Sequence, residues 1–282
     1  MKKGLVLEGG AMRGMFTCGV IDVFMENGIN FDGAAGISAG AVFGCNYKSR
    51  QIGRGVRYNK RFCNDKRYCS FNSLIKTGDL YNVKFCYHTI PNELDVFDKD
   101  TFKSNPLEFY IGATNVETGE EVFHKCMDGG LLDIEWMRAS ASMPMVSKVV
   151  EIGEYKLLDG GIVCPVPYEY MENLGFNRNV IVLTQPKDYR KKKPGKFLIS
   201  LFLNKYPKIK KSMLERYLVY NKQMDEIDKK EENGSCLVIR PPKKLDLSKT
   251  EKSQEKLEAA YQIGRQEALK RLDEVKKYLS IN

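Results

Sequence analysis

Histidine is scarce in this 282-residue chain, which contains only His88 and His124. A serine hydrolase that orders its triad as serine, acid and histidine needs a histidine late in the chain, so that triad is excluded here. A base other than imidazole is more economical, and a carboxylate is the available candidate. The two histidines are expected to be packing or surface residues.

Paired cysteines and metal-ligand spacings are missing as well. The chain has eight cysteines, but none forms a Cys-x-x-Cys pair, and several lie in apolar runs. This pattern predicts reduced, buried thiols in a cytoplasmic protein. No cluster of residues has the spacing of a metal site, and we expect neither a metal nor a cofactor.

Long apolar runs are also lacking. The best one, residues 197–203, is far shorter than the roughly 20 residues that span a bilayer, and we see no secretory signal after Met1. Hydrophobic residues make up 43% of the chain, which is enough for a sizeable core, and no internal repeat is apparent. We expect a single α/β domain over residues 1–282.

Positive charge is concentrated in one segment. The net charge is +9, and residues 187–216 hold eleven Lys or Arg against Asp188 and Glu215, which equals the whole excess. These cations flank the apolar run 197–203, as would suit a lid or an amphipathic segment resting on an anionic membrane surface. Nucleic acid is the competing, less favoured partner, and a solvated helical face is the simplest alternative.

A Gly-x-Ser-x-Gly motif lies between a strand-like segment that ends in apolar residues and a helix-like segment of small residues. It predicts a nucleophile elbow, a turn so tight that side chains two residues from the serine would collide. An ordinary glycine-rich turn is the alternative. The motif consists of Gly36, Ile37, Ser38, Ala39 and Gly40.

A second glycine-rich loop follows the buried strand predicted at residues 4–8. Its backbone N–H groups would hold either a phosphate or the oxyanion of acyl transfer. Met15 and Phe16 stand where a phosphate-binding loop needs Lys and Ser or Thr, and Ala11 stands at the second glycine of a dinucleotide fingerprint. A tight turn without function remains open. The loop consists of Gly9, Gly10, Ala11, Met12, Arg13 and Gly14.

Three aspartates precede glycine in ways that suit a catalytic base: Asp32, Asp128 and Asp159. Asp32 lies at the opposite end of the strand that precedes Ser38, about 20 Å away at roughly 3.3 Å per residue. Asp128 is expected as a turn residue ahead of a helix. Asp159 ends a strand, where its side chain is delivered to an edge of the sheet.

Three segments resemble, in the same order, the three sequence blocks of the patatin-like phospholipase family: residues 8–14, 36–40 and 159–161. Residues 139–144 also look like the family's segment ahead of its aspartate, so the likeness covers about residues 4–170. The resemblance implies a three-layer α/β/α fold with a mainly parallel sheet. It also implies Ser38 as nucleophile, Asp159 as its base with Gly160 and Gly161 in the Asp-Gly-Gly motif, and the glycine-rich loop as oxyanion hole.

The expected function is hydrolysis of a lipid or acyl ester through an acyl-enzyme. An acyltransferase or thioesterase with the same dyad is one alternative, and a catalytically silent lipid- or anion-binding module is another. Ala11 departs from the family pattern, which has glycine there; if the position needs a positive φ, alanine costs about 1 kcal/mol. Arg13 either braces the loop or receives an anionic head group.

The layout alternates strands and helices, with segments 51–105 and 187–210 covering the cleft. The last helix should begin after a cap at Ser248 or Thr250. Strands are expected at 4–8, 32–37, 108–115, 148–159, 178–184 and 236–240, and helices at 14–28, 38–50, 131–142, 167–173, 208–230 and 251–279.

Overall fold

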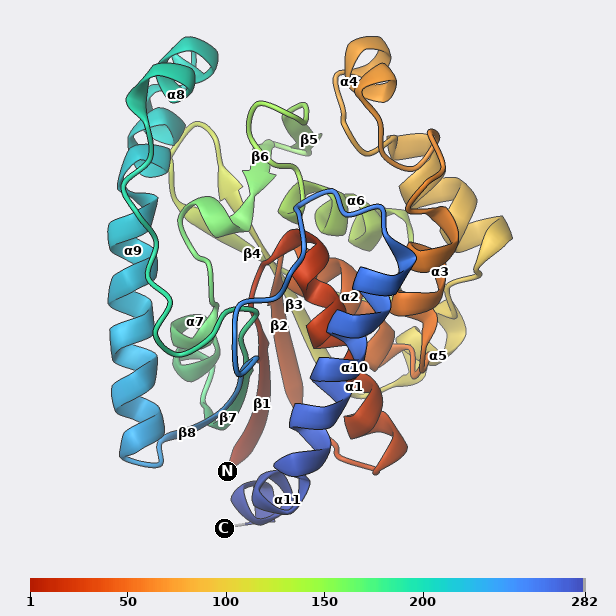
Figure 1. Ribbon diagram of the computed structural model, residues 1–282, viewed down its shortest axis with the longest axis vertical. Helices are drawn as coiled ribbons and strands as arrows, with labels where there is room; N and C mark the ends of the chain where they lie inside the picture. The colour runs from red at the N-terminus through yellow and green to blue at the C-terminus, as the bar shows by residue number, and fades with distance from the viewer. Residues whose placement is uncertain (281–282) are drawn as a thin grey trace.

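The computed structural model describes residues 1–280, so the last two residues of the expected 1–282 domain lie outside it. A mostly parallel eight-stranded sheet forms the middle layer, with helices on both faces (Figure 1). The strand order is β5-β6-β3-β2-β1-β7-β8, and β4 pairs with β3. The strands are β1 (Lys2–Leu7), β2 (Gly33–Ile37), β3 (Glu108–Asn115), β4 (Glu121–Cys126), β5 (Val150–Ile152), β6 (Tyr155–Asp159), β7 (Phe176–Val182) and β8 (Cys236–Ile239).

The central strands are apolar on both faces, as expected for strands buried between two layers of helices. Leu5 and Leu7 of β1 belong to a core shared with α1 (Gly14–Glu26), α2 (Ala39–Lys48) and α10 (Gln254–Lys270). Val6 belongs to the core on the other face, with α7 (Tyr168–Asn173) and α9 (Pro207–Glu232). The alternation along β1 therefore holds the two helical layers on opposite faces of one sheet.

The register along β3 brings two strand ends together. β2 pairs with residues 108–112 of β3 and β4 pairs with residues 109–114, so β2 and β4 lie on opposite edges of β3. β6 pairs with residues 113–115, also opposite β4, and therefore shares the edge with β2. Since β6 is antiparallel to β3, the ends of β2 and β6 meet at neighbouring positions on that edge.

The two expected cover segments stand on either side of the sheet's upper edge in Figure 1. Residues 51–105 fold into α3 (Arg54–Phe62), α4 (Phe71–Thr77), η2 (Phe85–Leu94) and α5 (Lys99–Ser104), although their weak periodicity did not predict these helices. Residues 187–195 form an extended strap that leads into α8 (Lys196–Leu203) and then into α9. Within residues 1–280, no helix is both long and apolar enough to span a bilayer.

Two of the expected elements are wrong in detail. The strand expected at 148–159 is a hairpin of β5 and β6, reversed at Gly153, which has a φ of +57°. The helix expected at 251–279 is interrupted at Arg271, giving α10 and α11 (Leu272–Ser280). Its cap is Ser253, whose hydroxyl accepts the N–H of Lys256. Glu251 explains the late start, because its carboxylate accepts backbone N–H groups of the turn that precedes the helix.

The remaining elements are α6 (Leu131–Ser140) and the short 3-10 turns η1 (Ala11–Arg13) and η3 (Gly160–Ile162).

Candidate active site

Ser38 sits on the sharp turn between β2 and α2, with φ of 53° and ψ of −117°, a conformation that non-glycine residues rarely adopt. The flanking glycines permit the turn, because the backbone comes very close to itself here. A Cβ atom at Gly36 would lie 2.4 Å from the carbonyl oxygen of Gly40, and one at Gly40 would lie 2.3 Å from that of Leu7. Backbone strain at a buried serine of this kind is typical of functional sites.

Ser38 and Asp159 are in direct contact. The Ser38 hydroxyl donates a hydrogen bond to Oδ2 of Asp159 at 2.7 Å. The second carboxylate oxygen accepts the N–H of Gly161 at 2.7 Å, and the Asp159 N–H donates to the carbonyl of Ser142 at 2.8 Å. The carboxylate is thereby held with one oxygen on the serine and the other on the Asp-Gly-Gly turn.

The electrostatics of this pair are dominated by burial, since only 6% of Asp159 is exposed. Burial raises the pKa of Asp159 above its ordinary value, while the guanidinium of Arg216 and the hydrogen bond from Ser38 oppose that rise. A carboxyl group with a raised pKa is a stronger base once it is ionised. The environment therefore tunes Asp159 in the direction that proton removal from an alcohol requires.

Ser140, at the end of α6, positions the nucleophile through its backbone. Its hydroxyl accepts the backbone N–H of Ser38 at 2.8 Å and donates to the carbonyl of Gly112 on β3 at 2.6 Å. The sequence drew attention to residues 139–144 but gave Ser140 no role. An isolated serine in a helical segment carries no signal for this bridge, because the two groups that it joins come from distant parts of the chain.

The glycine-rich loop packs directly against the nucleophile. A Cβ atom at Gly9 would lie 3.1 Å from Cβ of Ser38, so the loop backbone occupies the space in which an oxyanion hole would be built. Ala11, in the loop's first helical turn, has a φ of +49°. The position where the family has glycine therefore does require a positive φ. Glu8 fastens the loop to the end of β7, because its carboxylate accepts the N–H and the hydroxyl of Thr184.

The other loop residues surround this contact. Gly10 lies against Thr184, Gly14 lies against Phe43 of α2, and Met12 lies beside the dyad. Within residues 1–280, Nε of Arg13 is buried without a hydrogen-bond partner. Arg13 is thus placed at the site with an unused donor.

An apolar pocket opens at Ser38 and extends beneath residues 51–105, with about 1100 Å³ of space including its mouth. Ala11 and Met12 of the glycine-rich loop line the mouth together with Ser38. Side chains of α2, η2 and α6 form the walls. The apolar lining includes Val42, Phe43, Tyr58, Val83, Ile90, Phe97, Ile134 and Met137. The segment expected only as a cover therefore also contributes to the pocket wall.

The rejected aspartates and histidines have other partners. Asp32 accepts the N–H of Lys3 at the far end of β2, and Asp128 accepts that of Gly130 ahead of α6. His124 lies 2.7 Å from Asp133 and stacks on Trp136. None of these contacts involves Ser38 or Asp159.

A family model described as Patatin-like phospholipase matches residues 5–171, which include the elbow, the loop and Asp159. The chain belongs to the patatin-like phospholipase family. A second model, described as Domain of unknown function (DUF6363), matches residues 206–280 of this patatin-like chain. That second match covers α9, β8, α10 and α11.

Several relatives of this patatin-like chain carry curated names. It is 25% identical to Lysophospholipase NTE1 of Coccidioides immitis over 97% of its length, and 26% identical to a Patatin-like phospholipase domain-containing protein of Caenorhabditis elegans over 93%. It spans only 18% and 20% of those two proteins. Uncharacterized protein YjjU of Escherichia coli is 28% identical over 64% of this chain and 52% of its own.

Among solved structures, VipD from Legionella pneumophila is similar with a TM-score of 0.48 and 12% identity. The similarity covers 97% of this chain and 67% of VipD.

Proposed function

We propose that this patatin-like chain is a serine lipid acyl hydrolase of the phospholipase A or esterase type, with Ser38 as nucleophile and Asp159 as base. The observation that carries the proposal is the 2.7 Å hydrogen bond between their side chains at the mouth of an apolar pocket. Nucleophile and base within hydrogen-bond reach are the signature of an activated serine. The pocket offers an acyl chain an apolar environment on one side of that serine.

In the proposed mechanism, the Ser38 oxygen attacks the ester carbonyl while Asp159 takes its proton. Backbone N–H groups around Gly10, Ala11 and Met12 stabilise the oxyanion, assisted by the positive N-terminal end of α2. The alcohol leaves with the proton that Asp159 returns, and the acyl group stays on Ser38. Asp159 then removes a proton from water, which attacks the acyl-enzyme, and returns that proton to the Ser38 oxygen as the fatty acid is released.

Turnover of a short-chain p-nitrophenyl ester tests this proposal, with Ser38→Ala as the variant. We expect turnover by the parent protein and a loss to background in Ser38→Ala. A fluorophosphonate should label the parent protein on Ser38, as peptide mapping by mass spectrometry would establish. Labelling of another residue, or equal turnover by the variant, would overturn the assignment of the nucleophile.

Two alternatives are distinguished by related measurements. An acyltransferase with the same dyad would give an acylated product when an alcohol acceptor is added, whereas a hydrolase gives free fatty acid. A silent lipid- or anion-binding module would bind its ligand without turnover or labelling. The positive φ of Ala11 bears on the silent alternative, because a side chain in this backbone conformation costs about 1 kcal/mol and strains the loop that would hold the oxyanion.

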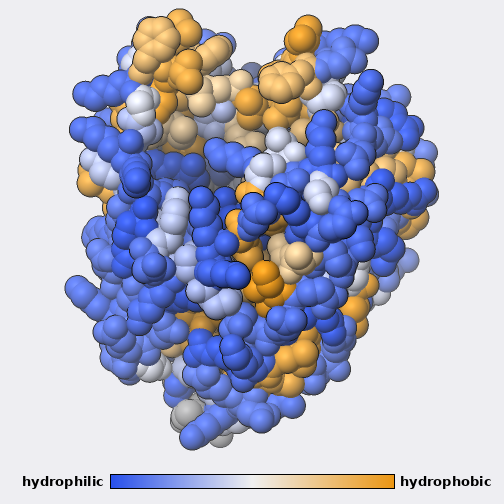
Figure 2. All heavy atoms as spheres, in the orientation of Figure 1, coloured by the Kyte–Doolittle hydropathy of each residue, from blue (hydrophilic) through white to orange (hydrophobic). Residues whose placement is uncertain are grey.

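We also propose that residues 187–216 contact an anionic membrane surface. Apolar side chains gather at the upper left and upper right of Figure 2, over α8 and α4, on either side of a hollow. In α8 the exposed ones are Phe197, Leu198, Leu201 and Phe202, and in α4 they are Phe71 and Ile75. Exposed lysines, among them Lys196, Lys205 and Lys208, adjoin the α8 group and complement anionic lipid.

A further inference from the structure

Cations surround the dyad, and most of them come from the part of the chain beyond the patatin match. The guanidinium of Arg216, on α9, donates to the carbonyl of Gly161 in the Asp-Gly-Gly turn. One turn later on the same helix face, Tyr220 lies beneath Lys191, whose ammonium is 3.6 Å from the centre of the ring. Lys191 and Arg216 therefore stand side by side next to Asp159. Arg13 approaches from the glycine-rich loop.

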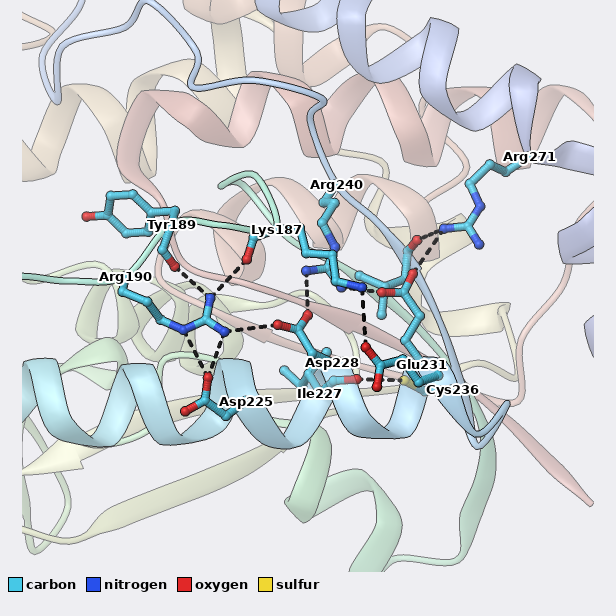
Figure 3. Close-up of polar contacts among 12 residues, drawn as sticks. Lys187, Tyr189, Arg190, Asp225, Ile227, Asp228, Glu231, Cys236, Arg240 and Arg271 are labelled. Carbon is cyan, nitrogen blue, oxygen red and sulfur yellow. Dashed lines mark hydrogen bonds and ion pairs between the residues drawn. The ribbon is translucent and has the colours of Figure 1, made fainter.

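The strap that carries Lys191 is fixed to α9. The N–H of Lys191 donates to the side chain of Asn221 at 2.7 Å, and the amide of Asn221 donates back to the Lys191 carbonyl at 3.1 Å. The neighbouring Arg190 pairs with Asp225 at 2.7 Å and with Asp228 at 3.0 Å, as Figure 3 shows. Lys191 is thus held over the dyad by a built support. An unanchored surface lysine would have no such partners.

The positive charges beside the dyad are not balanced by carboxylates. Within residues 1–280, Arg13, Lys191 and Arg216 form no ion pair within 4.0 Å. The nearby carboxylates are Asp159, which is engaged with Ser38, and Glu8, which is engaged with Thr184. Burial and the adjacent guanidinium of Arg216 hold the pKa of Lys191 well below its ordinary value. An added anion would relieve this repulsion.

Two donors in this region lack a well-formed hydrogen bond. Tyr220 is fully buried, and its hydroxyl forms no hydrogen bond of ordinary geometry among residues 1–280, although the Glu8 carboxylate lies near enough to raise the Tyr220 pKa. Nε of Arg13 is unpaired within the same residues. Buried donors without partners are rare in folded proteins and need an explanation. Guanidinium, ammonium and phenol donors together suit the oxygens of a phosphate.

We propose that Arg13, Lys191, Arg216 and Tyr220 form a subsite for a phosphate group carried by the leaving alcohol of the substrate ester. The inference rests on the proposed function and names its substrate class. The apolar pocket runs from Ser38 beneath residues 51–105, whereas Lys191 and Arg216 lie on the strap and α9, so the acyl chain and the leaving alcohol would lie on opposite sides of the nucleophile. The proposed substrate is therefore an acyl ester of a phosphate-bearing alcohol, and the region matched by the domain of unknown function supplies part of its recognition.

The test compares two esters with the same acyl chain, lysophosphatidate and monoacylglycerol, presented in neutral mixed micelles. We expect the ratio of their kcat/KM values, anionic over neutral, to fall by at least about tenfold in Lys191→Met, as loss of a buried charge-assisted contact predicts. Tyr220→Phe should lower the ratio by a smaller factor. Lys229→Met, at an exposed lysine near the far end of α9, is the matched control and should leave it unchanged. Equal ratios in all four proteins would overturn the subsite.

Binding to Ser38→Ala separates failure of the subsite from failure of the proposed function. Calorimetry should show that glycerol 3-phosphate binds Ser38→Ala and that the added change Lys191→Met weakens this binding by at least about tenfold. Binding without any turnover by the parent protein would support the subsite and contradict the hydrolase. Turnover without such binding and without a change of ratio would support the hydrolase and contradict the subsite. Inorganic phosphate that binds as tightly as glycerol 3-phosphate would overturn the assignment to a leaving alcohol.

Discussion

Ile37 and Asp159 lie opposite adjacent residues, Gly112 and Ala113, on the same edge of β3. The two strands that carry them approach this point from opposite directions, so backbone pairing alone places Ser38 next to the carboxylate. A slip of β6 by one residue would turn its side chains to the other face of the sheet. The 2.7 Å contact between the two side chains is therefore set by strand register as well as by side-chain rotamers.

Asp159→Asn removes the proposed base and keeps the shape of the side chain. The amide oxygen still accepts the N–H of Gly161, so the turn should remain folded. We expect kcat for a p-nitrophenyl ester to fall by about a thousandfold, within the usual contribution of general base catalysis. Circular dichroism and thermal melting check the fold. A variant that keeps most of the parent's activity would show that another group takes the proton.

Ser140→Ala tests the positioning role of Ser140. Loss of the hydroxyl leaves the buried N–H of Ser38 and the carbonyl of Gly112 without their bridge, which should cost about 1–3 kcal/mol of unfolding free energy. We expect kcat to fall with little change in KM, because the nucleophile and not the pocket is disturbed. Ser142→Ala is the matched control, since within residues 1–280 its hydroxyl bonds only to the Arg138 carbonyl in the preceding helical turn. Equal losses in the two variants would contradict a specific role for Ser140.

The sequence predicted those parts of the fold and site that depend on local pattern. Glycines around Ser38 are required by backbone contact, and this requirement is visible in the motif itself. The support from Ser140, Lys191 and Arg216 was not predictable, because each of these residues meets the site through a long-range contact. The interruption at Arg271 was likewise hidden, since its guanidinium joins Glu231 and the carbonyl of Val238 across the fold, as Figure 3 shows in part. Helical periodicity continues through that position.

Ala11→Gly should relieve backbone strain in the glycine-rich loop. Ala11 has a φ of +49°, a region that costs an L-residue about 1 kcal/mol and that glycine enters freely. We expect unfolding free energy to be unchanged or slightly higher, and kcat to rise as the loop amides relax toward the oxyanion. Ala268→Gly, inside α10, is the control and should destabilise the protein by about 1 kcal/mol. A destabilised Ala11→Gly with reduced kcat would contradict strain at this position.

Activity should depend on pH through Asp159, which must be ionised to act as a base. Its pKa is raised above the ordinary aspartate value, so kcat/KM should fall, as pH is lowered, at a higher pH than an exposed aspartate would give. Arg216→Met removes the cation that opposes this rise and should move the acidic limb of the profile to still higher pH. Arg216→Lys should restore it in part. A neutral p-nitrophenyl ester is the substrate, and profiles that coincide for all three proteins would contradict the assignment.

Membrane contact should require both apolar tips. Phe197 of α8 is 77% exposed and Phe71 of α4 is 78% exposed, and each sits in a group of exposed apolar side chains. We expect Phe197→Asp and Phe71→Asp each to weaken cosedimentation with anionic vesicles by about tenfold, because burying a charge at the lipid interface is unfavourable. Leu269→Asp, at an exposed position at the end of α10 next to α11, should bind as the parent does. Binding should also weaken as salt is raised, since the lysines beside α8 attract the lipid charge. Vesicle binding that is unaffected by salt and by both tip substitutions would show that neither cover meets the membrane.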